Sequence, residues 1–263
     1  MRIALTIFLI TMIGCSSKRE APKKGITRFF INKIAMPGGR EDRFLYANDT
    51  LLSQAEIYQD DVLVMRDKYY WSADHSLSCS TYDLSNNLVN LRTFSFTNGI
   101  ISWITIPSNF GYSFEYRIYF DDQKRLDHYE YGYSNRPGFI EKGFAQWLAD
   151  GLNMTMTYSI IVGSTVYPPV TNTFEVKSIG ENGSSVWYKL SPEALSTVFN
   201  RGVNIIEYFV PNQVIGIKSP SYGYYTYDKF EYDVDGNLIS IRRTDSNSNK
   251  IEYFSFEWKK VLL

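Results

Sequence analysis

The sequence predicts an all-β fold, an antiparallel meander of hairpins that forms a strongly curved sheet or an open barrel. Short runs of alternating apolar and polar residues follow one another along the chain, and turn-forming residues separate them. Aromatic residues make up 16% of the chain, and such residues favour half-buried, pleated surfaces. Helical spacing of apolar residues is almost absent, apart from one short helix predicted near 191–201.

The N-terminal residues predict an exported protein with a signal peptide over 1–14. An apolar run follows the positive charge of Arg2, which is typical of a secretory signal, and as a helix it reaches about 18 Å, too short for the ~30 Å core of a bilayer. The run ends in Met12-Ile13-Gly14-Cys15, which resembles the bacterial lipobox, although Met12 stands where that motif prefers Leu. The resemblance implies cleavage after Gly14 and lipidation of Cys15. The alternative is an ordinary cleaved signal with an incidental cysteine.

The rest of the chain divides into a tether and one domain. Residues 15–27 are polar and contain Pro and Gly, which predicts a lipidated N-terminus followed by a flexible tether. Residues 28–263 then form a single β-rich domain. In the sorting rule that the lipobox resemblance implies, Ser16 beside the cysteine points to the outer membrane, so the membrane is an expected partner through the N-terminal lipid. The sequence leaves open which side of that membrane the domain faces.

Charge and cysteine usage exclude two classes of protein. The 27 basic and 28 acidic residues nearly cancel, so no nucleic-acid partner is expected. With Cys15 acylated, Cys79 is the remaining cysteine, and no intrachain disulfide can form. A buried, inert thiol is expected at Cys79, because free cysteine is among the most buried residue types.

Residues Asn98-Gly99 predict the best-defined hairpin. Asn-Gly suits a two-residue type I′ turn, because both central residues need a positive φ. Such a turn places Phe96 opposite Ile101 and Phe94 opposite Trp103. The turn chemistry and the apolar pattern therefore require the same register.

Two further hairpins align in the same way. A turn at Gln123-Lys124 pairs Ile118 with Tyr129, although this turn lacks Gly or Asn. A turn at Asp235-Gly236 pairs Tyr232 with Ile239 and brings Asp228 opposite Arg243.

One spacing recurs along the chain: an aromatic residue, Asp, four residues, and Leu. It occurs at Tyr82-Asp83 with Leu88, Phe120-Asp121 with Leu126 and Tyr232-Asp233 with Leu238, and as a weaker copy without Asp at Tyr46 with Leu52. The segment 230–238 resembles the YD repeat of Rhs-type proteins, whose core is Tyr-x-Tyr-Asp-x-x-Gly-x-Leu. That resemblance implies β-hairpins stacked edge to edge in a curling sheet, and the chain is similar to lipoproteins of unknown function from Bacteroidetes-like bacteria that carry such units. The Asp is expected to accept hydrogen bonds from turn amides.

Two segments depart from the strand pattern. Residues 191–201 have an N-cap Ser191, Pro192 at the first helical position and Gly202 just beyond the end, which predicts a short helix. Between 138 and 169 the pattern is ambiguous: Phe144 to Ala149 could start a helix, whereas Met154 to Val162 resembles a buried strand.

No catalytic motif is present, and we expect a protein without enzymatic activity, cofactor or bound metal. His75 and His128 are the only histidines, and neither has cysteines or carboxylates at metal-ligand spacing. The adjacent acids at Asp60-Asp61 and Asp121-Asp122 fall at predicted turns. This position favours a role in the turn over the paired carboxylates of a glycoside hydrolase.

Aromatic clusters supply the candidate ligand-stacking residues, which are Tyr69, Tyr70, Trp71, Tyr222, Tyr224 and Tyr225. Successive residues of a strand point to opposite faces, so rings on a face outside the core could stack on a sugar or a peptide. The alternative is a two-layer fold that buries both faces.

Three functions follow from these features. The leading hypothesis is a non-catalytic binding or structural module of the cell envelope, with a glycan or an envelope protein as possible ligand. The second is a lipid or lipoprotein carrier with an apolar cavity, and the third is an envelope glycan hydrolase. An empty apolar interior would favour the carrier, an accessible ring-lined surface the binding module, and two facing carboxylates the hydrolase.

Overall fold

The computed structural model consists of antiparallel strands and describes residues 27–72, 76–97, 100–109, 111–123, 125–167, 174–184, 212–219 and 223–262. Seventeen strands and no helix lie in this described part, which confirms the all-β prediction. The strands are β1 (Thr27–Met36), β2 (Arg40–Ala47), β3 (Leu51–Gln59), β4 (Val62–Trp71), β5 (Leu77–Asp83), β6 (Leu88–Thr97), β7 (Ile100–Pro107), β8 (Phe114–Phe120), β9 (Leu126–Tyr133), β10 (Arg136–Trp147), β11 (Met154–Val162), β12 (Thr165–Val166), β13 (Phe174–Ser184), β14 (Asn212–Ser219), β15 (Gly223–Tyr232), β16 (Leu238–Asp245) and β17 (Lys250–Leu262).

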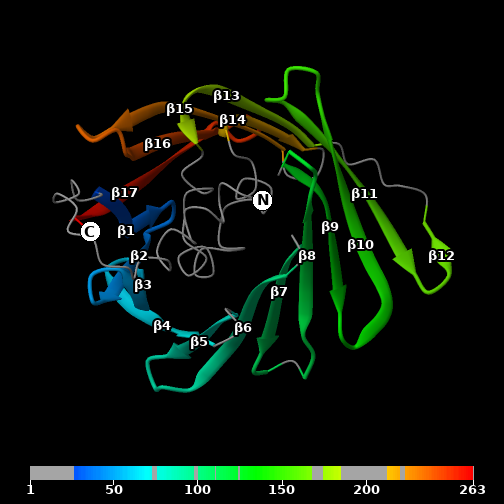
Figure 1. Cartoon of the computed structure of the whole chain (residues 1–263), viewed down its shortest axis with the longest axis horizontal. Coiled ribbons are helices and arrows are strands. Elements are labelled where there is room, and N and C mark those ends of the chain that lie inside the picture. Colours follow the sequence, from blue (N-terminus) through cyan, green and yellow to red (C-terminus); the bar gives the residue numbers. More distant parts are fainter. Residues whose placement is uncertain are drawn as a thin grey trace, which may run out of the picture.

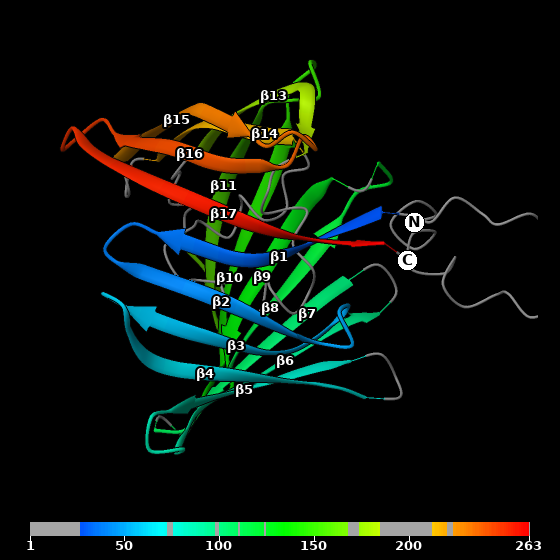
Figure 2. The same cartoon turned by 90° about the vertical axis from the view of Figure 1, so that its left-hand side faces the viewer.

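The strands follow one another in a strongly curved antiparallel meander (Figure 1). Each strand from β1 to β11 pairs with the next, and so does each from β13 to β17. The last strand, β17, pairs with β1 along its length, so the two ends of the domain lie side by side (Figure 2). The sheet therefore has an inner face, toward the space that the strands surround, and an outer face.

The sheet is largely open between β11 and β13, which pair over a short stretch. Three residue pairs join these strands, with Met154 opposite Val176 and Met156 opposite Phe174 at the ends of the contact. Beyond Met156, β11 diverges and pairs near its end with the two-residue strand β12. Among the described strands, most of this edge of β11 is therefore left open.

The registers of two predicted hairpins are confirmed. Phe94 lies opposite Trp103 and Phe96 opposite Ile101, as the apolar pattern requires, although residues 98 and 99 lie outside the described part. Ile118 lies opposite Tyr129, although the turn is wider than two residues and Phe120 pairs with Leu126.

The predicted register of the third hairpin is wrong by one residue. Tyr232 pairs with Leu238 instead of Ile239, and Asp228 lies opposite Arg242 instead of Arg243. A two-residue turn does not form here, because the Asp233 amide donates to the Asn237 carbonyl at 2.9 Å and closes a longer turn. Bulges between 228 and 232 shift the rest of the strand.

The recurrent aromatic-Asp-Leu spacing corresponds to one turn structure. The amide of the Asp donates to the carbonyl four residues later, at 3.0 Å for Asp83, 2.9 Å for Asp121 and 2.9 Å for Asp233. Its carboxylate accepts the amide of that same later residue, at 2.8 Å in all three turns. The aromatic residue and the Leu are cross-strand partners in each copy, and Tyr46 pairs with Leu52 in the copy without Asp. The spacing therefore has a purely structural explanation.

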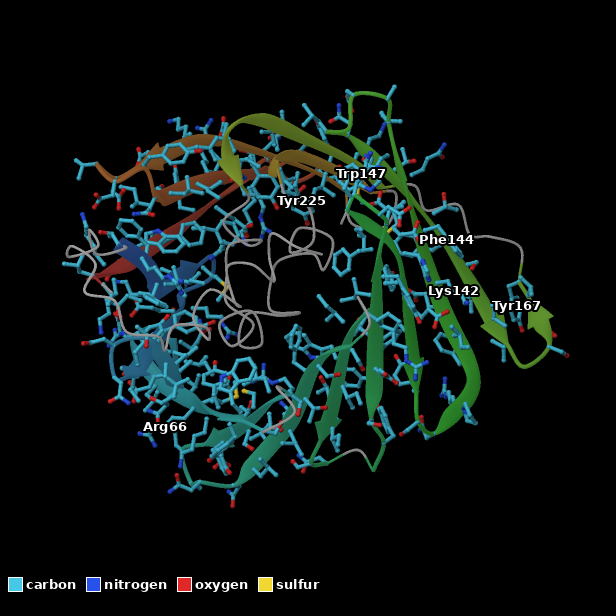
Figure 3. The ribbon with its side chains drawn as sticks, in the orientation of Figure 1. Arg66, Lys142, Phe144, Trp147, Tyr167 and Tyr225 are labelled. Atoms are coloured by element: carbon cyan, nitrogen blue, oxygen red, sulfur yellow. The ribbon has the colours of Figure 1, made fainter. Side chains whose placement is uncertain are left out.

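The inner face carries the hydrophobic core. Its largest completely buried side chains include Phe44 of β2, Trp103 of β7, Ile118 of β8 and Phe254 of β17. Tyr225 of β15 points to this side, whereas Arg66 of β4 points away from it (Figure 3). The burial of every second residue follows from the period of two that a strand imposes.

The outer face of the described strands carries rows of ion pairs between neighbouring side chains. These pairs are Lys33–Glu257, Arg43–Glu41, Arg66–Glu56, Arg117–Glu115, Lys142–Glu130 and Arg242–Asp228. Such pairs contribute little stability in water, and exposed apolar side chains such as Tyr70 and Phe144 lie on the same face.

Several predicted features lie outside the described residues: the signal peptide over 1–14, Cys15, most of the tether over 15–27 and the helix near 191–201. The possible helix start at Phe144 is wrong, because this residue lies in β10, where it pairs with Thr157 of β11. The strand predicted from Met154 to Val162 is β11, but within it Met154 and Met156 alone are buried. Among the described residues, no helix is long and apolar enough to cross a membrane.

Candidate functional site

Aromatic side chains gather on the inner face of four neighbouring strands, β8 to β11. The inner aromatic cluster comprises Tyr112, Phe114, Tyr116, Tyr129, Tyr131, Tyr133, Phe139 and Tyr158. Cross-strand pairing brings the rings together: Tyr116 lies opposite Tyr131, and Gly143 lies between Tyr129 and Tyr158. The Tyr116 and Tyr131 ring centroids are 4.4 Å apart. Tyr129 is buried, while the other rings are half-buried and retain accessible surface.

A glycine and a carboxylate shape the centre of this cluster. Gly143 has no side chain, so the Tyr129 ring lies over its backbone, where a Cβ would overlap the ring and lie 2.9 Å from Cζ. In this position the Tyr129 hydroxyl donates to Oε1 of Glu141 at 2.8 Å. Glu141 itself lies directly opposite Tyr131 on the neighbouring strand. The arrangement places one carboxylate among several phenol rings.

Burial dominates the electrostatics of these tyrosines. Burial, with smaller contributions from Tyr158 and from the negative charge of Glu141, raises the pKa of Tyr129 far above that of a free tyrosine. Burial and a hydrogen bond with Tyr133 likewise raise the pKa of Tyr131. Both phenols are therefore neutral donors at physiological pH. They can stabilise an anionic carboxylate but cannot neutralise it.

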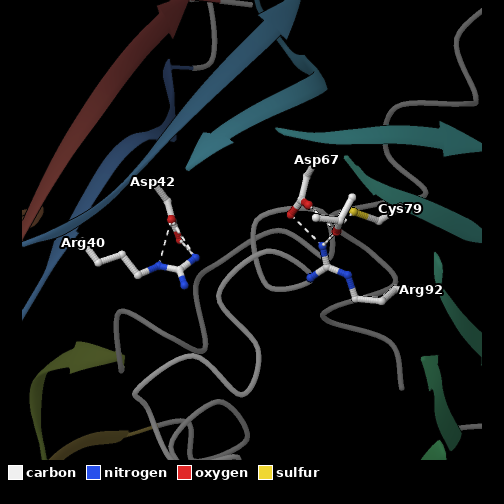
Figure 4. Close-up of polar contacts among 6 residues, drawn as sticks. Arg40, Asp42, Asp67, Cys79 and Arg92 are labelled. Atoms are coloured by element: carbon white, nitrogen blue, oxygen red, sulfur yellow. Dashed lines mark hydrogen bonds and ion pairs between the residues drawn. The ribbon is translucent and has the colours of Figure 1, made fainter. Parts of the chain in front are cut away.

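A second group of polar residues lies on the inner face of β2, β4, β5 and β6 (Figure 4). Arg92 donates to Asp67 at 2.6 Å, to Thr81 at 2.7 Å and to Sγ of Cys79 at 3.3 Å. Burial, the largest single effect, lowers the pKa of the Arg92 guanidinium, but the combined effects of Asp67, Cys79 and Tyr69 outweigh burial and raise this pKa. Asp42, also completely buried, accepts three hydrogen bonds from Arg40. The thiol of Cys79 is buried, as predicted.

Each acid in this second group has an arginine partner, so its net charge is close to zero. A third pair on the inner face, Arg243 with Glu252, is balanced in the same way. These clusters are well suited to hold strands together, because buried charges need partners. Sequence reasoning missed these ion pairs. A signal was present, because a charged residue two positions from a buried apolar one shares its face of the strand, as Asp42 does with Phe44.

The candidate stacking residues from the sequence do not form one site. Tyr69 is buried in the core, Tyr70 is 53% exposed on the opposite face, and Trp71 is half-buried. Tyr224 and Tyr225 of β15 are half-buried on opposite faces, and Tyr222 lies outside the described residues. The two groups come from β4 and β15, which are not neighbours in the sheet. Sequence reasoning did not single out the aromatic residues of β8 to β11, because they are spread over four segments.

The outer face of the same strands carries a smaller aromatic stack. The ring of His128 lies 4.1 Å from that of Tyr119 and 5.8 Å from that of Phe144, with nearly parallel planes. Phe144 and Lys142 lie on this side of β10 (Figure 3). His128 of β9 thus lies between Tyr119 of β8 and Phe144 of β10, and its Nδ1 is 2.7 Å from Oδ2 of Asp127, a carboxylate oxygen that accepts hydrogen bonds.

The adjacent acids of the sequence lie at turns. Asp60 and Asp61 both have a positive φ between β3 and β4, and Asp121 closes the turn after β8. Within the described part of the chain, no group of three or more His, Cys, Asp or Glu side chains is placed to hold a metal ion.

The fold and the site together define an antiparallel β protein with a concave inner face that is aromatic on one side.

No family model matches the sequence, and no curated protein matches it. Among solved structures, the chain is similar to a porin-like protein from Bacteroides uniformis, with a TM-score of 0.51 and 10% sequence identity. The match covers 87% of this chain and 98% of the other. At this identity the likeness shows a shared fold.

Proposed function

We propose that this protein is a non-catalytic binding module of the cell envelope, which is attached to a membrane by lipid on Cys15 and binds a ligand on its inner face. The inner aromatic cluster is the proposed binding surface. Phenol rings offer both a flat apolar surface and a hydroxyl, so they suit a ligand that has apolar and polar parts.

The partial exposure of the inner aromatic cluster is the observation that carries this proposal. On the inner face of β1 to β3 the core side chains are almost completely buried, and Ile34 and Ala55 have no exposed surface. By contrast, the rings of Tyr116, Tyr131 and Tyr158 are half-buried. Accessible aromatic surface on a concave face is characteristic of ligand sites.

Attachment through a lipid agrees with the charged side chains of the outer face. A sheet face in contact with lipid tails carries a band of apolar side chains. Here the described outer face mixes exposed apolar side chains such as Phe144 with ion pairs such as Lys33–Glu257 and Lys142–Glu130, and these ion pairs favour contact with water. The signal-like residues 1–14 with Cys15 supply a different means of attachment, and the porin-like neighbour is compatible with a location in the outer membrane.

The same burial pattern makes the other two functions less favoured. A carrier with an empty apolar interior needs accessible apolar lining, but Phe44, Ile57 and Phe254 are almost completely buried. A glycoside hydrolase needs two carboxyl groups that are free to act on either side of a glycosidic bond. Asp42 and Asp67 are instead engaged by Arg40 and Arg92.

Native mass spectrometry of the full chain, extracted from its envelope in mild detergent, tests the proposal. We expect the wild-type protein to retain a small molecule, and Tyr131→Leu to lose it because this ring lies at the centre of the cluster. Tyr119→Leu is the matched control, since it removes a half-buried ring from the outer face of the adjoining strand. Equal retention by Tyr131→Leu and Tyr119→Leu would contradict the proposed site, and a wild-type protein without any retained molecule would contradict the proposed function.

A further inference from the structure

We infer that the inner aromatic cluster binds an organic cation, a ligand with an alkylammonium group, and that Glu141 is its counter-charge. This inference rests on the proposed function, because it names the chemical class of ligand for the same surface. Its basis is the juxtaposition of several tyrosine rings with a carboxylate that has no cationic partner among the residues that the structure describes.

The charge balance of the inner face sets Glu141 apart. Asp42, Asp67 and Glu252 are each paired with an arginine. The structure gives the half-buried Glu141 carboxylate one hydrogen bond, from the neutral Tyr129 hydroxyl, and no ion pair with a described residue. A partly desolvated carboxylate with a single neutral donor is unfavourable, and a bound cation would offset that penalty.

The rings beside Glu141 have the chemistry that ammonium groups prefer. A cation is attracted to the negative face of an aromatic ring, and its binding is strongest where water is excluded. Tyr131 lies directly opposite Glu141 in the sheet, and the Tyr116 ring is 4.4 Å from that of Tyr131. A cationic ligand at this position would meet the negative charge of Glu141 beside phenol rings.

The protein already uses tyrosine as a partner for cations elsewhere. The guanidinium of Arg43 lies 4.0 Å from the centroid of the Tyr58 ring, and that of Arg243 lies 5.1 Å from Tyr225. Among the described residues, no lysine or arginine occupies such a position over Tyr131. A neutral sugar would also stack on these rings, but it would leave the charge of Glu141 uncompensated.

Calorimetric titration of the full chain in detergent tests this inference with three probes: choline, its neutral isostere 3,3-dimethylbutan-1-ol, and N-acetylglucosamine. We expect choline to bind at least ~10-fold more tightly than the isostere, because the two differ mainly in charge and the site offers a carboxylate beside aromatic rings. This comparison uses the wild-type protein alone, so it does not depend on how well a variant folds. Equal binding of choline and the isostere, or binding of N-acetylglucosamine without choline, would overturn the inference.

Two substitutions test whether Glu141 supplies the negative charge that binds choline. Glu141→Gln keeps the size of the side chain and should weaken choline binding at least ~10-fold while leaving the isostere unaffected. Glu130→Gln removes a carboxylate from the outer face of the adjoining strand and should leave both affinities unchanged. Unchanged choline binding in Glu141→Gln would contradict the role of this residue. If no probe binds but the wild-type protein retains a molecule in native mass spectrometry, the cationic class of ligand is wrong and the proposed function stands. If no probe binds and no molecule is retained, the proposed function also fails.

Discussion

At the scale of single residues, burial and close approach decide which side chains can be exchanged. Gly143 is needed because the Tyr129 ring occupies the place of a side chain, and Arg92 is needed because Asp67 is completely buried. Neither requirement depends on the turn or strand preference of the residue itself. Both follow from contacts between strands.

Gly143→Ala should destabilise the protein by about 1–3 kcal/mol, because the added methyl group overlaps the Tyr129 ring in a packed core. Urea unfolding followed by fluorescence measures this loss. Gly132→Ala on the neighbouring strand is the control, since its Cβ would meet one backbone oxygen at 3.2 Å and no ring. A larger loss for Gly132→Ala than for Gly143→Ala would show that the ring does not set the constraint.

Arg92→Met should destabilise the protein by about 3–5 kcal/mol, because it leaves Asp67 buried without a cation. The double variant Arg92→Met with Asp67→Leu should recover much of that loss, since it removes the uncompensated charge as well. Urea unfolding of both variants and of Asp67→Leu completes the thermodynamic cycle. Additive losses in the double variant would mean that the two side chains do not interact.

At the scale of elements, three hairpins share one turn in which an aspartate accepts the amide four residues later. Hydrogen bonds from Asn87 lower the pKa of Asp83, and those from Asn237 lower the pKa of Asp233. The ionised carboxylate is thus the form that the turn requires. Stability and pH are linked through these residues.

Stability should fall in acid as Asp83 and Asp233 become protonated. Because the pKa of Asp233 is lower in the folded state than in the unfolded chain, its contribution is complete above the unfolded value, about 4, and is lost as the pH falls through the folded value. We expect Asp233→Asn to be less stable than the wild type at pH 7 and to approach it at pH 2 to 3. Thermal unfolding across this range measures the difference, and a constant difference between the two proteins would contradict the linkage.

At the scale of the whole molecule, the strands follow one another around the structure until β17 meets β1, and the sheet parts between β11 and β13. The described domain begins at Thr27, beside the C-terminal strand. An N-terminal lipid would therefore hold the whole sheet at a membrane through residues 15–26.

Cys15→Ser should abolish both acylation and membrane attachment. We expect metabolic labelling with a fatty acid to mark the wild-type chain and not this variant, and fractionation to find the variant released from membranes. Cys79→Ser is the control, because this buried thiol plays no part in the proposed attachment. Labelling of Cys15→Ser, or an unlabelled wild-type chain, would exclude the lipoprotein interpretation.

The sequence by itself determined the all-β class, the registers around Phe94 and Ile118, and the recurrence of one turn at Asp83, Asp121 and Asp233. These features are local, since they depend on alternation along a strand and on the chemistry of a few turn residues. The register around Tyr232 was predicted wrongly, because bulges obey no such pattern. Only the tertiary structure decided that Glu141 lies among tyrosines of neighbouring strands and that Arg92 meets Asp67, because cross-strand neighbours depend on how distant segments pair.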